Sequence, residues 1–201
     1  MIDIYRIENS TFESNSYIAW DSDSRDCVII DCGDCEPLLK HIEASKLNLK
    51  GVLLTHGHFD HIYGLNDLLK TFPNITIYCS EGTAQLLYDK KLNYSLYHEQ
   101  EYEFEGSKEL IKILKDSDTL DFFDCCKIEA IATPGHDKGC LSFIIGDHFF
   151  TGDSYIPGIK TVTNLRGNKK EAVESEEKIK SHIADRQLLV CPGHGTTAYE
   201  G

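Results

Sequence analysis

The sequence lacks several features that would place it in a common protein class. No apolar run approaches the roughly 18 residues that a membrane-spanning helix needs, so we expect no membrane association. The first residues do not place a basic stretch before an apolar one, which disfavours a signal peptide and favours a cytoplasmic protein. No repeat, low-complexity tract or linker stands out. We therefore expect a single domain, residues 1–201, long enough to bury a sizeable core.

Positive charge is also scarce. The chain has 20 Lys and Arg residues against 33 Asp and Glu residues, which gives a formal net charge of −13. Binding to nucleic acid depends largely on Lys and Arg neutralising phosphates, so this balance disfavours a nucleic-acid partner. We expect a small-molecule substrate instead, and the sequence leaves the oligomeric state open.

A second C-x-x-C pair, which a zinc ribbon would need, is absent. The eight cysteines are scattered, and the single pair formed by Cys32 and Cys35 stands alone. Several cysteines lie beside strand-like apolar runs, where a free thiol behaves as a small hydrophobe. We therefore interpret the cysteines as unbridged side chains without a role in the chemistry.

Strand-like and helix-like patterns alternate along the chain. Alternating or continuous apolar runs predict strands at residues 2–7, 16–20, 27–31, 52–54, 75–79, 119–123, 127–132, 141–145, 148–151 and 188–191. Apolar residues at helical spacing predict helices at 37–45, 62–71, 82–90 and 169–184. Strands followed by helices in both halves indicate a layered α/β architecture.

The most informative feature is the loop H-G-H-F-D-H at residues 56–61, directly after an apolar strand. Imidazole and carboxylate groups are ligands that borderline divalent cations such as zinc readily bind. Residues two apart in an extended segment point the same way, so His56 and His58 can bind one ion. Asp60 and His61 lie further along and can face a second ion. The loop therefore predicts two metals, and hence chemistry rather than a structural site.

Three later loops repeat this context. His136, Asp153 and His194 each follow a predicted strand and a glycine that relaxes the backbone. Ligands on loops at the ends of strands, over a rigid sheet, are the usual construction of an active site. Four other histidines lack this context, and we interpret them as ordinary side chains: His41, His98, His148 and His182.

The motifs H-x-H-x-D-H, T-P-G-H, T-G-D and P-G-H-G, in this order, resemble those of the metallo-β-lactamase-fold hydrolases over essentially the whole chain. The resemblance implies a four-layer αββα sandwich with a dinuclear site at one edge of the sheets. It implies two sets of ligands and a bridge: His56, His58 and His136 for the first metal, Asp60, His61 and His194 for the second, and Asp153 between them. It further implies that Asp31 orients ligands from outside the site.

Within this superfamily the chain most resembles the glyoxalase II-like hydrolases. The positions of His61 and Asp153 favour that branch, and the H-x-E-x-D pattern of flavodiiron proteins is absent. A full glyoxalase II has a C-terminal helical region that helps bind glutathione, whereas this chain ends at Gly201, so we expect a short form without it. The segment G-R-[ST]-D that often follows T-G-D in these relatives is also missing. The hydrolytic core carries over, and the specificity for glutathione thioesters does not.

The expected function is metal-dependent hydrolysis. Two divalent ions, zinc in the first place and iron or manganese as alternatives, would share a bridging hydroxide, because bound zinc lowers the pKa of water to about 7. Asp60 would act in catalysis by aiming that hydroxide at the substrate carbonyl. A thiolate, with an ordinary pKa of about 8.5, leaves without a strong general acid. A thioester is therefore an easy substrate class, and the resemblance implies a thioester of the hydroxyacylglutathione type or a related ester.

Other functions stay open on the residues alone. They are a lactone hydrolase, a mononuclear iron persulfide (sulfur) dioxygenase, and a metal-binding module without catalysis; an RNA-processing nuclease is disfavoured by the acidic charge. Substrate-binding residues are not identified. The segment 91–106, with Asn93, Tyr94, Tyr97 and Tyr102, could form a pocket wall or an ordinary surface loop. Lys160, Asn164 and Arg166 could meet a substrate carboxylate, but solvated surface groups are the simpler interpretation.

Overall fold

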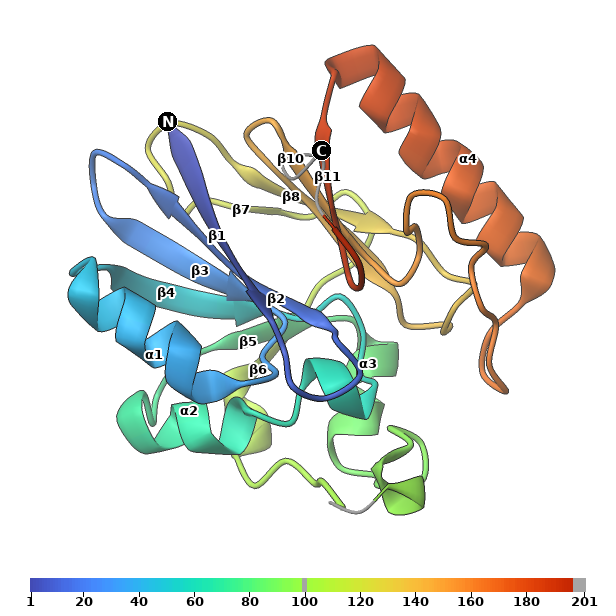
Figure 1. Ribbon diagram of the computed structural model, residues 1–201, viewed down its shortest axis with the longest axis horizontal. Helices are drawn as coiled ribbons and strands as arrows, with labels where there is room; N and C mark the ends of the chain where they lie inside the picture. Colours follow the sequence, from blue (N-terminus) through green and yellow to red (C-terminus); the bar gives the residue numbers. More distant parts are fainter. Residues whose placement is uncertain (99–100, 197–201) are drawn as a thin grey trace.

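The strands of the chain form two sheets that face each other (Figure 1), in a computed structural model that describes residues 1–98 and 101–196. The six-stranded sheet has the order β1-β2-β3-β4-β5-β6: β1 (Ile2–Glu8), β2 (Asn15–Asp21), β3 (Asp26–Ile30), β4 (Asn48–Leu53), β5 (Ile77–Cys79) and β6 (Ile111–Ile113). The five-stranded sheet has the order β11-β10-β9-β8-β7: β7 (Thr119–Leu120), β8 (Ile128–Ala132), β9 (Leu141–Ile145), β10 (His148–Gly152) and β11 (Leu189–Pro192).

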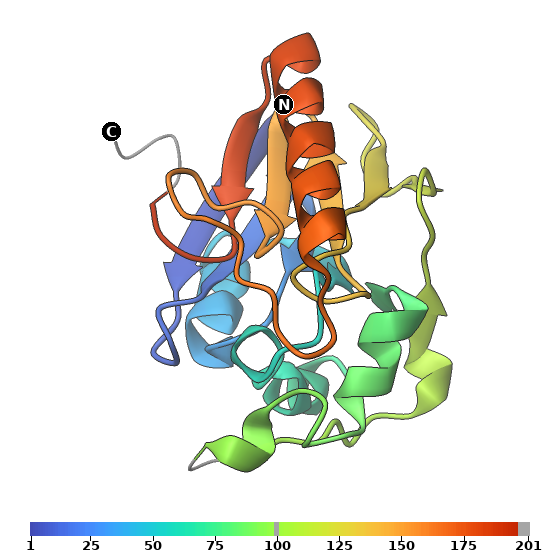
Figure 2. The same cartoon turned by 90° about the vertical axis from the view of Figure 1, so that its right-hand side faces the viewer.

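Helices cover the outer faces of both sheets (Figures 1 and 2). Helices α1 (Cys35–Ala44) and α2 (Leu65–Thr71) lie on the six-stranded sheet, and the long helix α4 (Lys169–Arg186) lies on the five-stranded sheet. The other helical segments are α3 (Glu81–Leu87) and three short 3₁₀ turns, η1 (Phe59–His61), η2 (Ser95–Tyr97) and η3 (Lys108–Leu110). Within the described ranges, no helix has the length and apolar character to cross a membrane.

Three apolar clusters hold the four layers together. In β3, Cys27 and Ile29 belong to the cluster beneath α1 and α2, whereas Val28 and Ile30 belong to the cluster between the sheets. This alternation follows from the two-residue period of a strand, and it explains why β3 reads as a continuous apolar run. A third cluster, which includes Ile179, packs α4 on the five-stranded sheet. The predicted αββα sandwich is confirmed.

The structure differs from the predicted elements in a few places. Strand β6 was not predicted; it is an edge strand of three residues, Ile-Lys-Ile, too short for its alternation to stand out. The helix predicted from residue 62 begins at Leu65, because residues 59–61 first form the 3₁₀ turn η1. The strand predicted at 119–123 is shorter, ending at Leu120.

The two sheets are joined at the edge where the motif loops emerge. β3 runs parallel to β4 and β10 runs parallel to β11, so the loops after each pair leave at the same end of their sheet. Two backbone hydrogen bonds cross between the sheets there: Leu141 N–H donates to the Thr55 carbonyl (2.8 Å), and Asn15 N–H donates to the Gly193 carbonyl (2.7 Å). The motif loops therefore meet over a rigid edge.

Candidate metal centre

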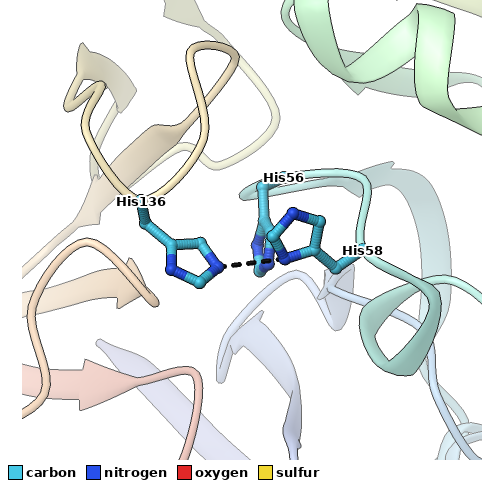
Figure 3. Close-up of side chains that lie close together, drawn as sticks. All are labelled: His56, His58 and His136. Atoms are coloured by element: carbon cyan, nitrogen blue, oxygen red, sulfur yellow. Dashed lines mark hydrogen bonds between the residues drawn. The ribbon is translucent and has the colours of Figure 1, made fainter. Parts of the chain in front are cut away.

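The predicted ligands gather in two groups. His56, His58 and His136 form the first, with one ring nitrogen of each within 4.8 Å of the others. Figure 3 shows these rings pointing toward one another, two from the loop after β4 and one from the loop after β8; His58 Nδ1 and His136 Nε2 are 3.0 Å apart. The second group is Asp60, His61 and His194, within the same limit.

Asp153 lies between the two groups. Its Oδ2 is 3.4 Å from His136 Nε2 in the first group and 3.5 Å from His194 Nε2 in the second. Its Oδ1 is 3.4 Å from His61 Nε2. This is the position that the resemblance assigned to a bridging ligand, and a single carboxylate there can serve both groups.

The ring nitrogens that point away from the centre, here called the outer nitrogens, are also held. Four of the five histidines place the outer Nδ1 near an oxygen: His56 at Thr55 Oγ1 (3.1 Å), His61 at Asp31 Oδ2 (3.0 Å), His136 at the Val162 carbonyl (2.7 Å) and His194 at the Phe12 carbonyl (3.0 Å). A hydrogen on Nδ1 leaves Nε2 with a lone pair directed at the centre. Such support orients the ligands of a metal and sets their tautomer.

Asp31, which the resemblance implied to be a residue that orients ligands, lies beside His61. Its carboxylate accepts hydrogen bonds from Thr55 N–H (2.8 Å) and Thr55 Oγ1 (2.7 Å) and meets His61 Nδ1. Asp31 has a φ of 56°, a left-handed conformation that Asp adopts more readily than most residues, and it follows the end of β3 directly. Because both oxygens are engaged with Thr55 and His61, we interpret Asp31 as orienting His61 rather than as a ligand.

Two glycines let the loops approach closely. A Cβ on Gly193 would stand 2.2 Å from Asp153 Oδ1 and 3.0 Å from His61 Cε1. Gly135, before His136, has a φ of 139°, which side chains rarely tolerate. These glycines explain why the T-P-G-H and P-G-H-G motifs need Gly before the histidine.

The electrostatics of His56, His58 and the two carboxylates of the centre suit a cation. Burial and neighbouring rings lower the pKa of His56 far below its usual range and that of His58 to about 4. Both rings are therefore neutral at pH 7, which is the form that ligates. Burial alone would raise the pKa values of Asp60 and Asp153, but His61 and hydrogen bonds from His194 hold both below their ordinary range, so both carboxylates are ionised.

His61 and His194 show the opposite shift. Burial alone would lower the pKa of His61, but the carboxylates of Asp60, Asp153 and Asp31 raise it to about 9. Hydrogen bonds to Asp153 and Asp60 similarly outweigh burial and raise the pKa of His194 to about 10. Without a cation, protons on these rings would balance the carboxylates, and a metal ion would replace them.

Two buried atoms of the centre without hydrogen-bond partners in the described part of the chain are a second, independent indication that these residues suit a metal. Within the described residues, His56 Nε2 and Asp153 Oδ1 are buried and have no hydrogen-bond partner. A buried polar atom without a partner costs about 1–3 kcal/mol, so such atoms are rare unless something else occupies them. His56 belongs to the first ligand group and Asp153 lies between the two groups, and a cation would satisfy both atoms.

The remaining candidates are only partly near the centre. Tyr94 packs its ring edge-on against His58, with ring centroids 5.0 Å apart, whereas Tyr102 and Asn93 are buried in the body of the protein. Residues 99 and 100 of the candidate segment 91–106 lie outside the described residues. The four histidines interpreted as ordinary side chains, at 41, 98, 148 and 182, belong to none of the metal-capable groups found in the described ranges.

Several supporting residues were missed by the sequence reasoning. Arg166, considered for a substrate carboxylate, donates from Nε to Asp137 Oδ2 (2.8 Å), and Asn164 places its amide nitrogen 2.9 Å from His58 Nε2. The carbonyls of Val162 and Phe12 support histidines through the backbone, which leaves no pattern in the sequence. Of these supporting residues, only Asp137 could have been noticed in the sequence, because a carboxylate directly after the proposed ligand His136 is a candidate for supporting the site.

A family model described as the metallo-beta-lactamase superfamily matches residues 10–194, which include both ligand groups and Asp153. The chain belongs to the metallo-beta-lactamase superfamily. Among curated relatives, it is 30% identical over 186 residues to a hydroxyacylglutathione hydrolase of Salmonella typhi, covering 92% of this chain and 64% of that protein. It is 33% identical over 147 residues to a hydroxyacylglutathione hydrolase of Buchnera aphidicola subsp. Baizongia pistaciae, covering 73% of this chain and 49% of that protein. This superfamily member thus spans less than two thirds of these relatives.

Solved structures of the superfamily share the fold. The BLEG-1 B3 metallo-beta-lactamase superposes with a TM-score of 0.83 at 24% identity, covering 98% of this chain and 93% of that one. TTHA1623 in a di-iron-bound form superposes with a TM-score of 0.80 at 23% identity (96% and 93% covered), and ETHE1 from Myxococcus xanthus with 0.71 at 22% (98% and 80%). At these identities the likeness concerns the fold alone.

Proposed function

We propose that this chain is a dinuclear metallohydrolase that cleaves a thioester of the hydroxyacylglutathione type or a related ester. The observation that carries the proposal is the place of Asp153, whose two oxygens reach histidines of both ligand groups. The proposed ligands are His56, His58 and His136 for one ion and Asp60, His61 and His194 for the other. The likeness to curated hydroxyacylglutathione hydrolases supports the substrate class.

The site residues have separate tasks in this proposal. Two divalent ions would supply Lewis acidity and a water molecule whose pKa is lowered to about 7. Asp60 Oδ2 lies 3.3 Å from His194 Nε2 and 3.4 Å from His61 Nε2, so its carboxylate stands at the centre of the second group. From there Asp60 can accept a hydrogen bond from the attacking water and aim it at the carbonyl carbon.

The choice of metal is also part of the proposal. The donor set of imidazoles and carboxylates suits zinc, iron or manganese, and zinc is the first candidate. TTHA1623, of similar fold, was solved in a di-iron-bound form, which supports iron as the second candidate. Metal content therefore has to be measured and not assumed.

The test combines metal analysis with a hydrolysis screen on the same preparation. The protein is purified aerobically and anaerobically, its metal is quantified, and S-D-lactoylglutathione, other thioesters, lactones and a phosphodiester are offered. We expect two metals per chain and release of thiol from thioesters. One iron per chain, with oxygen uptake on glutathione persulfide, would identify the dioxygenase alternative instead. Two metals without any turnover would leave a binding module.

A further inference from the structure

His58 differs from the other four histidines of the centre. Their outer nitrogen is Nδ1 and lies near an oxygen. His58 instead turns Nδ1 toward His136 (Figure 3) and leaves Nε2 outside. In a neutral His136 ring, Nε2 is the acceptor, because Nδ1 lies 2.7 Å from the Val162 carbonyl and a carbonyl oxygen only accepts. The hydrogen between the two rings therefore sits on His58 Nδ1. In this arrangement His58 has no lone pair to offer to the centre.

The group facing His58 Nε2 agrees with that tautomer. Asn164 Oδ1 accepts a hydrogen bond from Arg166 N–H (2.8 Å), so the amide nitrogen of Asn164 is the atom that points at His58 Nε2 from 2.9 Å. An amide nitrogen only donates, and Nε2 must accept. Asn164 thus holds the tautomer of His58 that cannot bind a metal through Nδ1.

A carboxylate that can accept a hydrogen bond lies near the same nitrogen. Asp137 Oδ2 lies 3.9 Å from His58 Nε2. The Asp137 side chain is 1% exposed, and its carboxylate is held by Gly139 N–H (2.9 Å) and Arg166 Nε (2.8 Å). Arg166 is also engaged through Nη2 with the Gly82 carbonyl (3.4 Å). A buried ion pair contributes little net stability as a rule, so its place beside a candidate ligand suggests another purpose.

We propose that Asp137, fixed by Arg166, is a positioning residue that holds His58 in the tautomer that binds metal. When a cation takes the lone pair of Nδ1, the ring hydrogen is carried by Nε2, and this N–H passes from the donor Asn164 to the acceptor Asp137. The ring stays neutral throughout: one hydrogen leaves Nδ1 and one is taken up at Nε2 through solvent. The proposal rests on the ligand role of His58 in the proposed function but not on any substrate.

The test uses the whole chain and the isosteric variant Asp137→Asn. Affinity for Zn²⁺ and Co²⁺ is measured by competition with a chelator, and the tautomer of His58 is read from ring ¹⁵N chemical shifts before and after loading. We expect the wild-type ring to carry its hydrogen on Nδ1 without metal and on Nε2 with metal. Asp137→Asn should lose about 10–100-fold in affinity for the ion at the three histidines. Its Co²⁺ absorption spectrum should change as well.

A matched control and a rescue separate positioning from a merely structural role. Arg166→Gln should weaken metal binding, whereas Arg186→Gln, which breaks a similar pair with Glu129 (2.9 Å) on the outer surface, should not. Asn164→Asp replaces the donor at His58 Nε2 by an acceptor, so it should restore metal affinity to Asp137→Asn. Thermal unfolding of each metal-free variant detects loss of folding.

The possible results distinguish the positioning role of Asp137, the ligand assignment and the proposed reaction. Wild-type affinity in Asp137→Asn, or no rescue by Asn164→Asp in that background, would overturn the positioning role. A wild-type chain that takes up no metal would overturn the ligand assignment and this proposal with it. A chain that binds metal as described but cleaves no substrate would overturn only the proposed reaction.

Discussion

Replacing Asp31 by Asn tests how much the support behind His61 contributes. The substitution keeps the shape of the side chain, and Asn also tolerates the φ of 56° at this position, so the backbone need not move. The carboxylate now meets Thr55 N–H, the Thr55 hydroxyl and His61 Nδ1 at 2.7–3.0 Å. An amide offers one oxygen and one NH₂ group in its place. The NH₂ group then faces the Thr55 hydroxyl and His61 Nδ1, so it is accommodated only if the hydroxyl turns to accept and His61 changes its tautomer.

The expected loss of metal affinity follows from the hydrogen bonds that the amide can and cannot make. The amide oxygen can keep Thr55 N–H, and its NH₂ group then faces His61 Nδ1, which favours the His61 tautomer with its hydrogen on Nε2. That tautomer points a hydrogen, not a lone pair, at the second ligand group. Loss of such a supporting partner weakens metal binding by about 10–100-fold, which corresponds to about 1.4–2.8 kcal/mol.

The assay is competition of the loaded protein with a chelator, and the chain offers a matched control. Asp21 ends β2 as Asp31 follows β3; it is 1% exposed and accepts a hydrogen bond from Asp23 N–H (3.0 Å). Asp21→Asn should therefore reduce stability without changing metal affinity. If both variants bind metal as tightly as the wild type, or lose affinity equally, the reasoning about His61 is refuted.

Three further predictions concern the same centre. Asp153→Ala should abolish coupled binding of two metals, as measured by metal content, whereas His41→Ala should leave that content unchanged; equal loss in both would contradict the ligand assignment. In the metal-free protein, the raised pKa values of His61 and His194 (about 9 and about 10) contribute stability that is present below the unfolded value of about 6.5 and is lost as pH rises through the folded values. Its melting temperature should therefore fall from about pH 8 to 10 more than that of the loaded protein, and parallel curves would contradict this. Gly193→Ala should lower metal content, because the new Cβ would stand 2.2 Å from Asp153 Oδ1, and unchanged content would show that the loop can yield.

The grouping of the proposed ligands could be predicted from the sequence because each has a local signature. A predicted strand and then a glycine precede His136, Asp153 and His194, and the structure brings these three side chains to one edge. The supports could not be predicted in the same way. The Val162 carbonyl that meets His136 is a backbone atom, which any residue would supply. Asp137 and Arg166 pair across 29 residues, and only the folded chain places them together.

The arrangement of the centre implies a balance between metal affinity and the stability of the metal-free chain. Two buried atoms, His56 Nε2 and Asp153 Oδ1, have no hydrogen-bond partner among the described residues, at a cost of about 1–3 kcal/mol each. The carboxylates of Asp60 and Asp153 stand close enough to shift both His61 and His194 upward in pKa. In the proposed centre a bound cation would offset all of these terms at once, so its binding energy would also become stability of the fold, about 4.1 kcal/mol at 1,000 times the Kd. Because the proposed ligands come from loops of both sheets, that stabilisation would act on the edge that joins them.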